Sequence, residues 1–256
     1  MTPSVLFPLP DRDFDVTEVA VPWKLLSERG VDVVFATEEG ATPAADPTLL
    51  DGVIFGQLGA EPEPRRFYRE LEQVSAFRAP LRWREIDFDR FDGLFLAGGH
   101  APGMRQYLGS EALQQKIAHF FALGRPVGAI CHGVLPLARA VDPARGGPLL
   151  RGRRTTCLPK YMERVAYYLT AWKLGRHYRT YDAYVEDEVV DALASAEDFV
   201  RGPISLVARG TRDDHAPAFV VEDGHYISAR WPGDSYLVAD RFGDLLGASR
   251  AGAPQP

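Results

Sequence analysis

One segment of the sequence is typical of a nucleophilic cysteine. Cys131 follows the apolar run 127–130 and precedes His132 and Gly133. In a nucleophile elbow the reactive side chain stands on a tight strand-to-helix turn, which tolerates only small flanking residues. Ala129 and Gly133 meet this requirement on either side of the cysteine. We therefore predict that Cys131 attacks an electrophile, in preference to the alternative of an inert buried cysteine.

The residue after this cysteine could move its proton. His132 is a candidate base or proton shuttle, and its backbone amide is a candidate oxyanion donor. The alternative is a histidine that only shapes the turn. A helix is predicted at 134–140, and its N-terminus would favour the thiolate form of Cys131.

Two glycines form a second candidate segment. Gly98 and Gly99 follow the strand-like run 93–96 and precede His100. Bare backbone amides at the end of a strand can approach a substrate closely. We predict that Gly99 donates to an oxyanion if its strand neighbours that of Cys131, with Gly98 and His100 as candidate substrate contacts. A simple turn is the alternative.

An acidic residue early in the chain is the third candidate. Glu18 lies in the first turn of a predicted helix, 17–29, with Thr17 as its N-cap. A carboxyl group that burial keeps protonated can hydrogen-bond a thiolate. Acids are also common in first turns because of the helix dipole, and the residues alone favour that structural role.

These segments lie in an alternation of strand-like and helix-like runs. It predicts an α/β fold with a mostly parallel sheet covered on both faces, whose reactive groups gather at the carboxyl ends of strands. Two long segments, 43–90 and 149–202, are interpreted as insertions on a single domain, 1–246, and 247–256 as a flexible tail. The predicted strands are 4–7, 31–36, 92–96 and 126–130, with a hairpin at 218–228; the other predicted helices are 110–123 and 235–246.

Together, Glu18, the segment 98–100 and the segment 129–133 resemble the ThiJ/PfpI superfamily. This superfamily includes PfpI-type intracellular proteases, the parkinsonism-associated deglycase and the bacterial heat-shock chaperone/glyoxalase, and is related to class I glutamine amidotransferases. The resemblance implies a flavodoxin-like three-layer sandwich. It also implies that Cys131 is the nucleophile, that Glu18 hydrogen-bonds its sulfur, and that the amides of Gly99 and His132 form the oxyanion hole.

The sequence also departs from the family pattern. In heat-shock-type members an acid about thirty positions after the cysteine orients the histidine, but Lys160 stands near that place and Glu163 is the remaining candidate. The C-terminal half lacks the His-x-Glu pair of amidotransferases, so we do not expect glutamine hydrolysis. Arg230, before the last helix, is a candidate ligand of an anionic substrate group, with a surface ion pair as the alternative.

The helix-like segment 160–174 carries a stripe of large side chains. Tyr161, Val165, Tyr168 and Trp172 recur at helical spacing. Such a stripe usually packs against the core, and we expect it to do so here.

Composition excludes several classes of protein. The 256 residues carry a net charge of −6, which argues against nucleic-acid and anionic-membrane partners. With no signal peptide evident and only two cysteines, Cys131 and Cys157, we expect a cytoplasmic protein. No metal is predicted, because no ligand spacing is seen among His119, His177, His215 and His225. A homodimer is expected from the family resemblance.

The leading hypothesis is a cofactor-independent enzyme in which Cys131 adds to a small electrophilic substrate. A glyoxalase or deglycase acting on 2-oxoaldehydes is its simplest form, and a hydrolase or hydratase is another. One alternative is a stress-response chaperone or redox sensor with an oxidisable cysteine. The others are an amidase or peptidase of PfpI type and a biosynthetic enzyme for a larger substrate.

Overall fold

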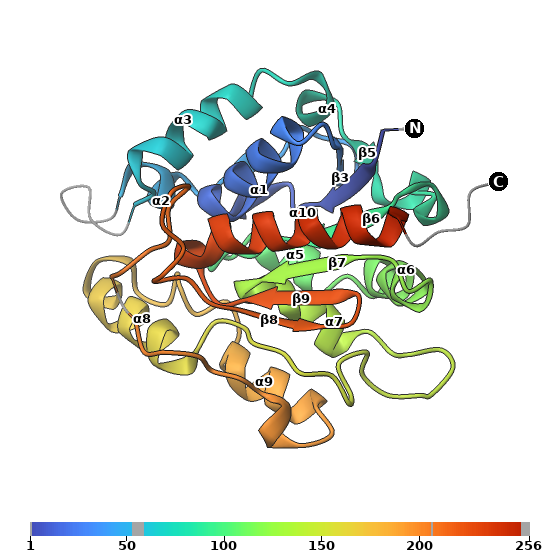
Figure 1. Ribbon diagram of the computed structural model, residues 1–256. Coiled ribbons are helices and arrows are strands. Elements are labelled where there is room, and N and C mark those ends of the chain that lie inside the picture. The colour runs from blue at the N-terminus through green and yellow to red at the C-terminus, as the bar shows by residue number, and fades with distance from the viewer. Residues whose placement is uncertain (1, 53–58, 206, 252–256) are drawn as a thin grey trace.

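The central sheet contains seven strands in the order β5-β3-β1-β6-β7-β9-β8 (Figure 1). The structure is a computed structural model that describes residues 2–52, 59–205 and 207–251. Neighbouring strands of this sheet are parallel except β8 and β9, which form the predicted antiparallel hairpin. The main strands are β1 Ser4–Pro8, β3 Asp32–Thr37, β5 Leu81–Arg82, β6 Gly93–Leu96, β7 Val127–Ile130, β8 Val220–Asp223 and β9 Tyr226–Ala229. A small separate sheet pairs β2 Arg12–Phe14 with β4 Ala44–Ala45.

Helices cover both faces of this sheet, as the predicted flavodoxin-like sandwich requires. α1 and α10 lie on one face and pack against each other, whereas α6 and α7 lie on the opposite face (Figure 1). The helices are α1 Val16–Glu28, α2 Pro47–Asp51, α3 Pro62–Leu71, α4 Ser75–Arg78, α5 Met104–Leu108, α6 Glu111–Ala122, α7 Leu135–Arg139, α8 Lys160–Leu174, α9 Val185–Ala192 and α10 Ser235–Ala251. Among the described residues, no helix is long and apolar enough to cross a bilayer.

Aromatic side chains between these layers fill the core. Phe7 stacks on Phe95 with ring centroids 4.9 Å apart, and Phe242 of α10 meets Phe95 edge-on at 5.5 Å. All three rings are fully buried. Burying a Phe side chain stabilises a fold by about 1.5–3 kcal/mol, so this packing fixes α10 on β1 and β6.

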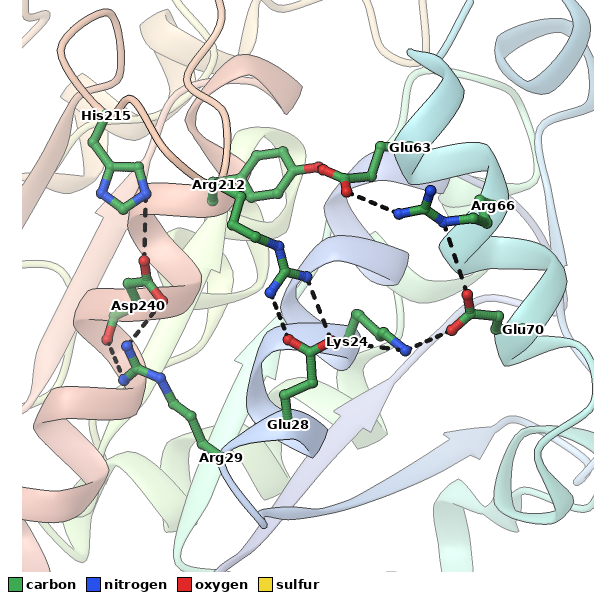
Figure 2. A network of polar contacts seen from close by, with 10 residues as sticks. Lys24, Glu28, Arg29, Glu63, Arg66, Glu70, Arg212, His215 and Asp240 are labelled. Atoms are coloured by element: carbon green, nitrogen blue, oxygen red, sulfur yellow. Dashed lines mark hydrogen bonds and ion pairs between the residues drawn. The ribbon is translucent and has the colours of Figure 1, made fainter.

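Ion pairs connect the outer helices on the same face (Figure 2). Lys24 of α1 reaches Glu70 of α3 at 2.6 Å, and Glu28 accepts from Arg212 at 2.6 Å. Arg29, just after α1, pairs with Asp240 of α10 at 2.8 Å. These side chains are partly exposed, and such pairs contribute about 1 kcal/mol or less each. Apolar packing therefore contributes most of the stability of this helical layer, and the ion pairs add little to it.

Several predicted boundaries change. α1 is capped by Asp15, not Thr17: the Asp15 carboxylate accepts from the amides of Thr17 at 2.8 Å and Glu18 at 3.1 Å. α10 continues through 247–251, which the sequence assigned to the tail, while 252–256 lie outside the described residues. The segment 43–90 contributes β5, which pairs with β3, and α3, which packs on α1.

Candidate functional site

The carboxyl ends of three adjacent strands, β1, β6 and β7, bring the candidate residues to one edge of the sheet. β1 leads through the segment 9–15, which includes β2, into α1, which carries Glu18 in its first turn. β6 is followed by the segment 97–100, and β7 ends directly before Cys131. This is the edge at which α/β sheets place their ligands. The predicted neighbourhood of the β6 and β7 strands is confirmed.

The turn at Cys131 has the geometry of a nucleophile elbow. Cys131 has φ of 59°, in the left-handed region that residues other than glycine rarely adopt. It opens a 3-10 turn, Cys131–Val134, that leads into α7. A Cβ atom on Gly133 would lie 2.1 Å from the Leu96 carbonyl oxygen, so only glycine fits there. Strain of this kind persists where the surroundings fix the backbone, and it is common at reactive residues.

Gly98 lies between Glu18 and the Cys131 elbow. Its amide donates to Glu18 Oε2 at 2.8 Å. A Cβ atom at this glycine would lie 2.8 Å from the same oxygen, 2.8 Å from the His132 nitrogen and 3.0 Å from Cys131 Cβ. Gly98 therefore lets the carboxyl group and the elbow approach each other. Because its amide is already engaged, it positions Glu18 and does not contact substrate through that amide.

Burial controls the charge of Glu18. It is fully buried, and desolvation raises its pKa well above the ordinary value, with the negative charge of Asp15 raising it further. The Gly98 hydrogen bond opposes this rise without reversing it. Burial therefore favours the protonated form of Glu18, the state in which its carboxyl group can donate to sulfur.

The Cys131 thiol is also neutral in the free protein. The residue is 2% exposed, and burial raises the pKa of its thiol well above the ordinary value, with any negative charge on Glu18 raising it more. The expected thiolate at a helix N-terminus is therefore wrong for this state. α7 begins only at Leu135 and has five residues, so its dipole is a weak opponent of burial.

Two histidines, His100 and His132, lie beside Cys131. Together with Glu18 they form what we call the polar floor of the site. His132 Nδ1 lies 3.5 Å from Cys131 Sγ, and the His100 ring meets the His132 ring edge-on with centroids 4.6 Å apart. Burial lowers the pKa of His100 to about 4 and that of His132 well below its ordinary value. Both rings are neutral at neutral pH, so His132 can accept the thiol proton. The three residues also bring potential metal-ligand atoms within 4.8 Å of one another.

A cavity of about 370 Å³ opens above this floor. Its polar lining consists of Asp15, Thr17, Glu18, Gly99, His100, Cys131, Thr170 and Arg209. The Gly99 amide donates to no described residue, which leaves it free for an oxyanion. The remaining wall is largely apolar and comprises Val16, Leu49, Ala60, Leu158, Met162, Val165, Ala166, Leu169, Tyr178, Val207, Trp231 and Pro232.

Two predicted site residues are engaged elsewhere. Arg230 is fully buried, and its guanidinium donates to Asp234 at 2.9 and 2.8 Å and to the Pro203 carbonyl at 2.6 Å. It forms the ion pair that the sequence left as the alternative, although a buried one. Glu163 faces Arg179 at 3.4 Å and accepts from the Val185 amide at 3.1 Å. Within the described ranges it has no contact with His132, so its role as the orienting acid gains no support.

Sequence reasoning missed other members of the site. Asp15 lines the cavity, and burial raises its pKa to about 6. Arg209 also lines it, with its guanidinium 4.8 Å from the centre of the Trp231 ring, and its charge opposes the rise at Asp15. No sequence pattern indicates Arg209. Asp15 could have been found as an alternative N-cap of the first helix, because an Asp directly before a helix is typical of that position.

The stripe on α8 is not packed as expected. The helix itself is confirmed, but Tyr168 and Trp172 are 63% and 73% exposed. Val165 and Leu169 turn toward the cavity instead of the core. The helical period was correct, but only Tyr161 of the stripe packs against the core; Val165 lines the cavity, and Tyr168 and Trp172 face the solvent.

Comparisons with known proteins agree with this architecture. The family model described as ThiJ/PfpI family-like matches residues 9–203. Deglycase PYRAB04690 of Pyrococcus abyssi is 27% identical over 234 residues, which cover 91% of this chain and 93% of the deglycase. Uncharacterized protein C14C4.04 of Schizosaccharomyces pombe is 31% identical over 247 residues, covering 94% of this chain and 83% of that protein.

A solved structure shares the fold. Glyoxalase III (Orf 19.251) from Candida albicans superposes with a TM-score of 0.67 at 20% identity, covering 96% of this chain and 97% of that one. The match extends over the central sheet and its flanking helices, in agreement with the family match. The chain belongs to the ThiJ/PfpI-like family.

Proposed function

We propose that this protein is a cofactor-independent enzyme that converts 2-oxoaldehydes with an apolar substituent into 2-hydroxy acids. The observation that carries the proposal is the neutral thiol of Cys131, which lines a largely apolar cavity and lies 3.5 Å from the neutral imidazole of His132. The deglycase and glyoxalase relatives support an enzyme of this type. The cavity wall supplies the substrate preference.

The first step is addition of the thiol to the aldehyde carbon. Cys131 Sγ forms a bond to that carbon while the thiol proton passes to His132 Nδ1, and the carbonyl π electrons move to oxygen. The Gly99 and His132 amides hold this oxyanion. Protonation of the oxygen gives a hemithioacetal. No charge has to be created before substrate arrives, because thiol and imidazole are both neutral.

The second step moves hydrogen between the two substrate carbons. A base removes the proton from the former aldehyde carbon, and the neighbouring ketone oxygen is protonated to give an enediol. Protonation of the other carbon, with return of the proton from the hydroxyl group beside sulfur to the base, leaves a thioester, and water releases the 2-hydroxy acid and the thiol. Overall, one 2-oxoaldehyde and one water give one 2-hydroxy acid. Glu18 and His132 are the groups beside the sulfur that could carry these protons.

The cavity is larger than a three-carbon substrate needs. Its volume of about 370 Å³ is in the range of drug-sized ligands. Leu169, Val165 and Trp231 would cover an aryl or alkyl substituent at the ketone end of the substrate. A redox-sensing thiol would be exposed and of low pKa, and Cys131 is neither.

Turnover of phenylglyoxal and methylglyoxal tests both parts of the proposal. We expect kcat/KM to be at least about tenfold higher for phenylglyoxal, since filling an apolar pocket contributes about 1–3 kcal/mol per methylene-sized group. Leu169→Gln should lower that ratio. Cys131→Ala should abolish turnover, and Cys157→Ala, outside the cavity, should keep it. Turnover that survives Cys131→Ala refutes the mechanism; equal use of both aldehydes refutes the apolar preference.

A further inference from the structure

Three side chains from two strand ends converge on one point. Cys131 and His132 follow β7, and His100 follows β6. One ligand-type atom from each lies within 4.8 Å of the others, and Cys131 Sγ is 3.5 Å from His132 Nδ1. His100 Nε2 is buried and has no hydrogen-bond partner among the described residues. A buried polar nitrogen without a partner needs an explanation, and a bound ion supplies one.

The spacing of these atoms fits a tetrahedral zinc site. Zinc lies about 2.3 Å from cysteine sulfur and about 2.0–2.1 Å from histidine nitrogen, which puts sulfur and nitrogen about 3.5 Å apart at a tetrahedral angle. The observed separation of Cys131 Sγ and His132 Nδ1 is 3.5 Å. The ligand atom of His100 lies within 4.8 Å of the other two and would have to move closer to them to become the third ligand. Thiolate and imidazole are the ligands that zinc prefers.

The surroundings favour a cation and give it access. Cys131 and His100 line the cavity, so an ion can enter from there, and a water molecule can complete the fourth position. Glu18 and Asp15 line the same cavity, and a bound cation would favour the ionised form of both carboxyl groups. Binding releases the thiol proton to solvent, so the bound centre of Zn²⁺ and thiolate carries one net positive charge. Acidic neighbours stabilise that charge.

We propose that His100, Cys131 and His132 form a Zn²⁺ site that opens on the cavity and that its occupancy reversibly removes Cys131 as a nucleophile. Zinc would hold the sulfur as a ligand and His132 as a second ligand, so neither could act on a substrate. Zinc binding requires no substrate. The zinc proposal can therefore fail while the proposed function stands, and the proposed function can fail while zinc still binds.

Direct metal binding by the full chain is the test. We expect one Zn²⁺ per chain in competition with a chromophoric chelator, and slower alkylation of Cys131 by iodoacetamide when zinc is present. Cys157 is fully buried and serves as the internal reference for alkylation. Co²⁺ in place of zinc should give the thiolate-to-metal charge-transfer band and the intense visible bands of a four-coordinate site.

Ligand variants locate the site. Cys131→Ala, His100→Gln and His132→Gln should each weaken zinc binding by more than about tenfold, because even supporting residues of metal sites contribute tenfold or more. His119→Gln is the matched control: this histidine lies elsewhere, on α6, paired with Asp89 at 2.9 Å. The proposal is overturned if His119→Gln weakens binding as much. It is also overturned if the wild-type Co²⁺ spectrum lacks the thiolate band, a result that needs no variant to fold.

Discussion

Replacing Gly133 with alanine is the sharpest perturbation of the elbow. The added Cβ would lie 2.1 Å from the Leu96 oxygen and 2.7 Å from the Ala97 oxygen, whereas real Cβ contacts begin near 3.0 Å. Leu96 pairs with Ala129 across β6 and β7, so the obstructing strand cannot move alone. The elbow must shift by about 1 Å. We expect a loss of about 3 kcal/mol, the upper end for overpacking, and about 100-fold lower activity from displacing the nucleophile.

Urea denaturation and the alkylation rate of Cys131 measure the two effects separately. Gly247→Ala is the matched control, because its Cβ would meet nothing within 4 Å in α10 and alanine is favoured in a helix by up to about 1 kcal/mol. The reasoning fails if Gly133→Ala unfolds within about 1 kcal/mol of the wild type and alkylates at the wild-type rate. If Gly133→Ala is mostly unfolded, its activity and alkylation rate are measured relative to the fraction that remains folded.

Two further predictions concern buried charges. Burial raises the pKa of Asp15 from 3.8 to about 6, so the folded state binds the extra proton and stability falls as pH rises through this interval. Asp15→Asn keeps the helix cap and should remove about 2 kcal/mol of that fall, measured as the wild-type-minus-variant difference between pH 4 and 7; parallel curves would contradict it. Arg230→Met leaves the fully buried Asp234 without its counter-ion and should cost about 3–5 kcal/mol in urea denaturation. A cost below about 1 kcal/mol would show that the pair is not structural.

Much of the fold could be predicted because its signals are local. The strands around Val5, Val33, Phe95 and Ala129 are short apolar runs, and Ser110 caps α6 as the sequence indicates. β5 could not be found, since two residues carry no periodicity and pair only because β3 offers a free edge. The end of α10 was missed because a Gly/Ala-rich run is typical of a loose tail, yet nothing obstructs helix at Gly247.

The site divides along the same line. The elbow was predictable, because the small residues it requires stand beside Cys131 in the sequence. The role of Gly98 was not, because the atoms that exclude a side chain there come from distant segments and its amide binds Glu18 instead of a substrate. The role of Arg230 was open, although Asp234 stands four residues later and is the partner in the structure. The ionisation of Cys131 was not predictable, because it depends on burial by segments distant in the sequence. The grouping of His100 with Cys131 and His132 likewise depends on strand order, which ligand spacing along the chain does not reveal.

The neutral state of the floor has a consequence for the proposed chemistry. A buried thiolate–imidazolium pair would have to be formed against desolvation before any substrate arrived. In this site the thiol of Cys131 and the ring of His132 are both uncharged, so charge separates only as sulfur adds to carbon. In the proposed mechanism the oxyanion would then lie beside the Gly99 amide, and an apolar substituent would pack against the cavity wall formed by α8. Reactivity of the sulfur is thereby tied to occupation of the cavity, and a buried cysteine of raised pKa is compatible with nucleophilic catalysis.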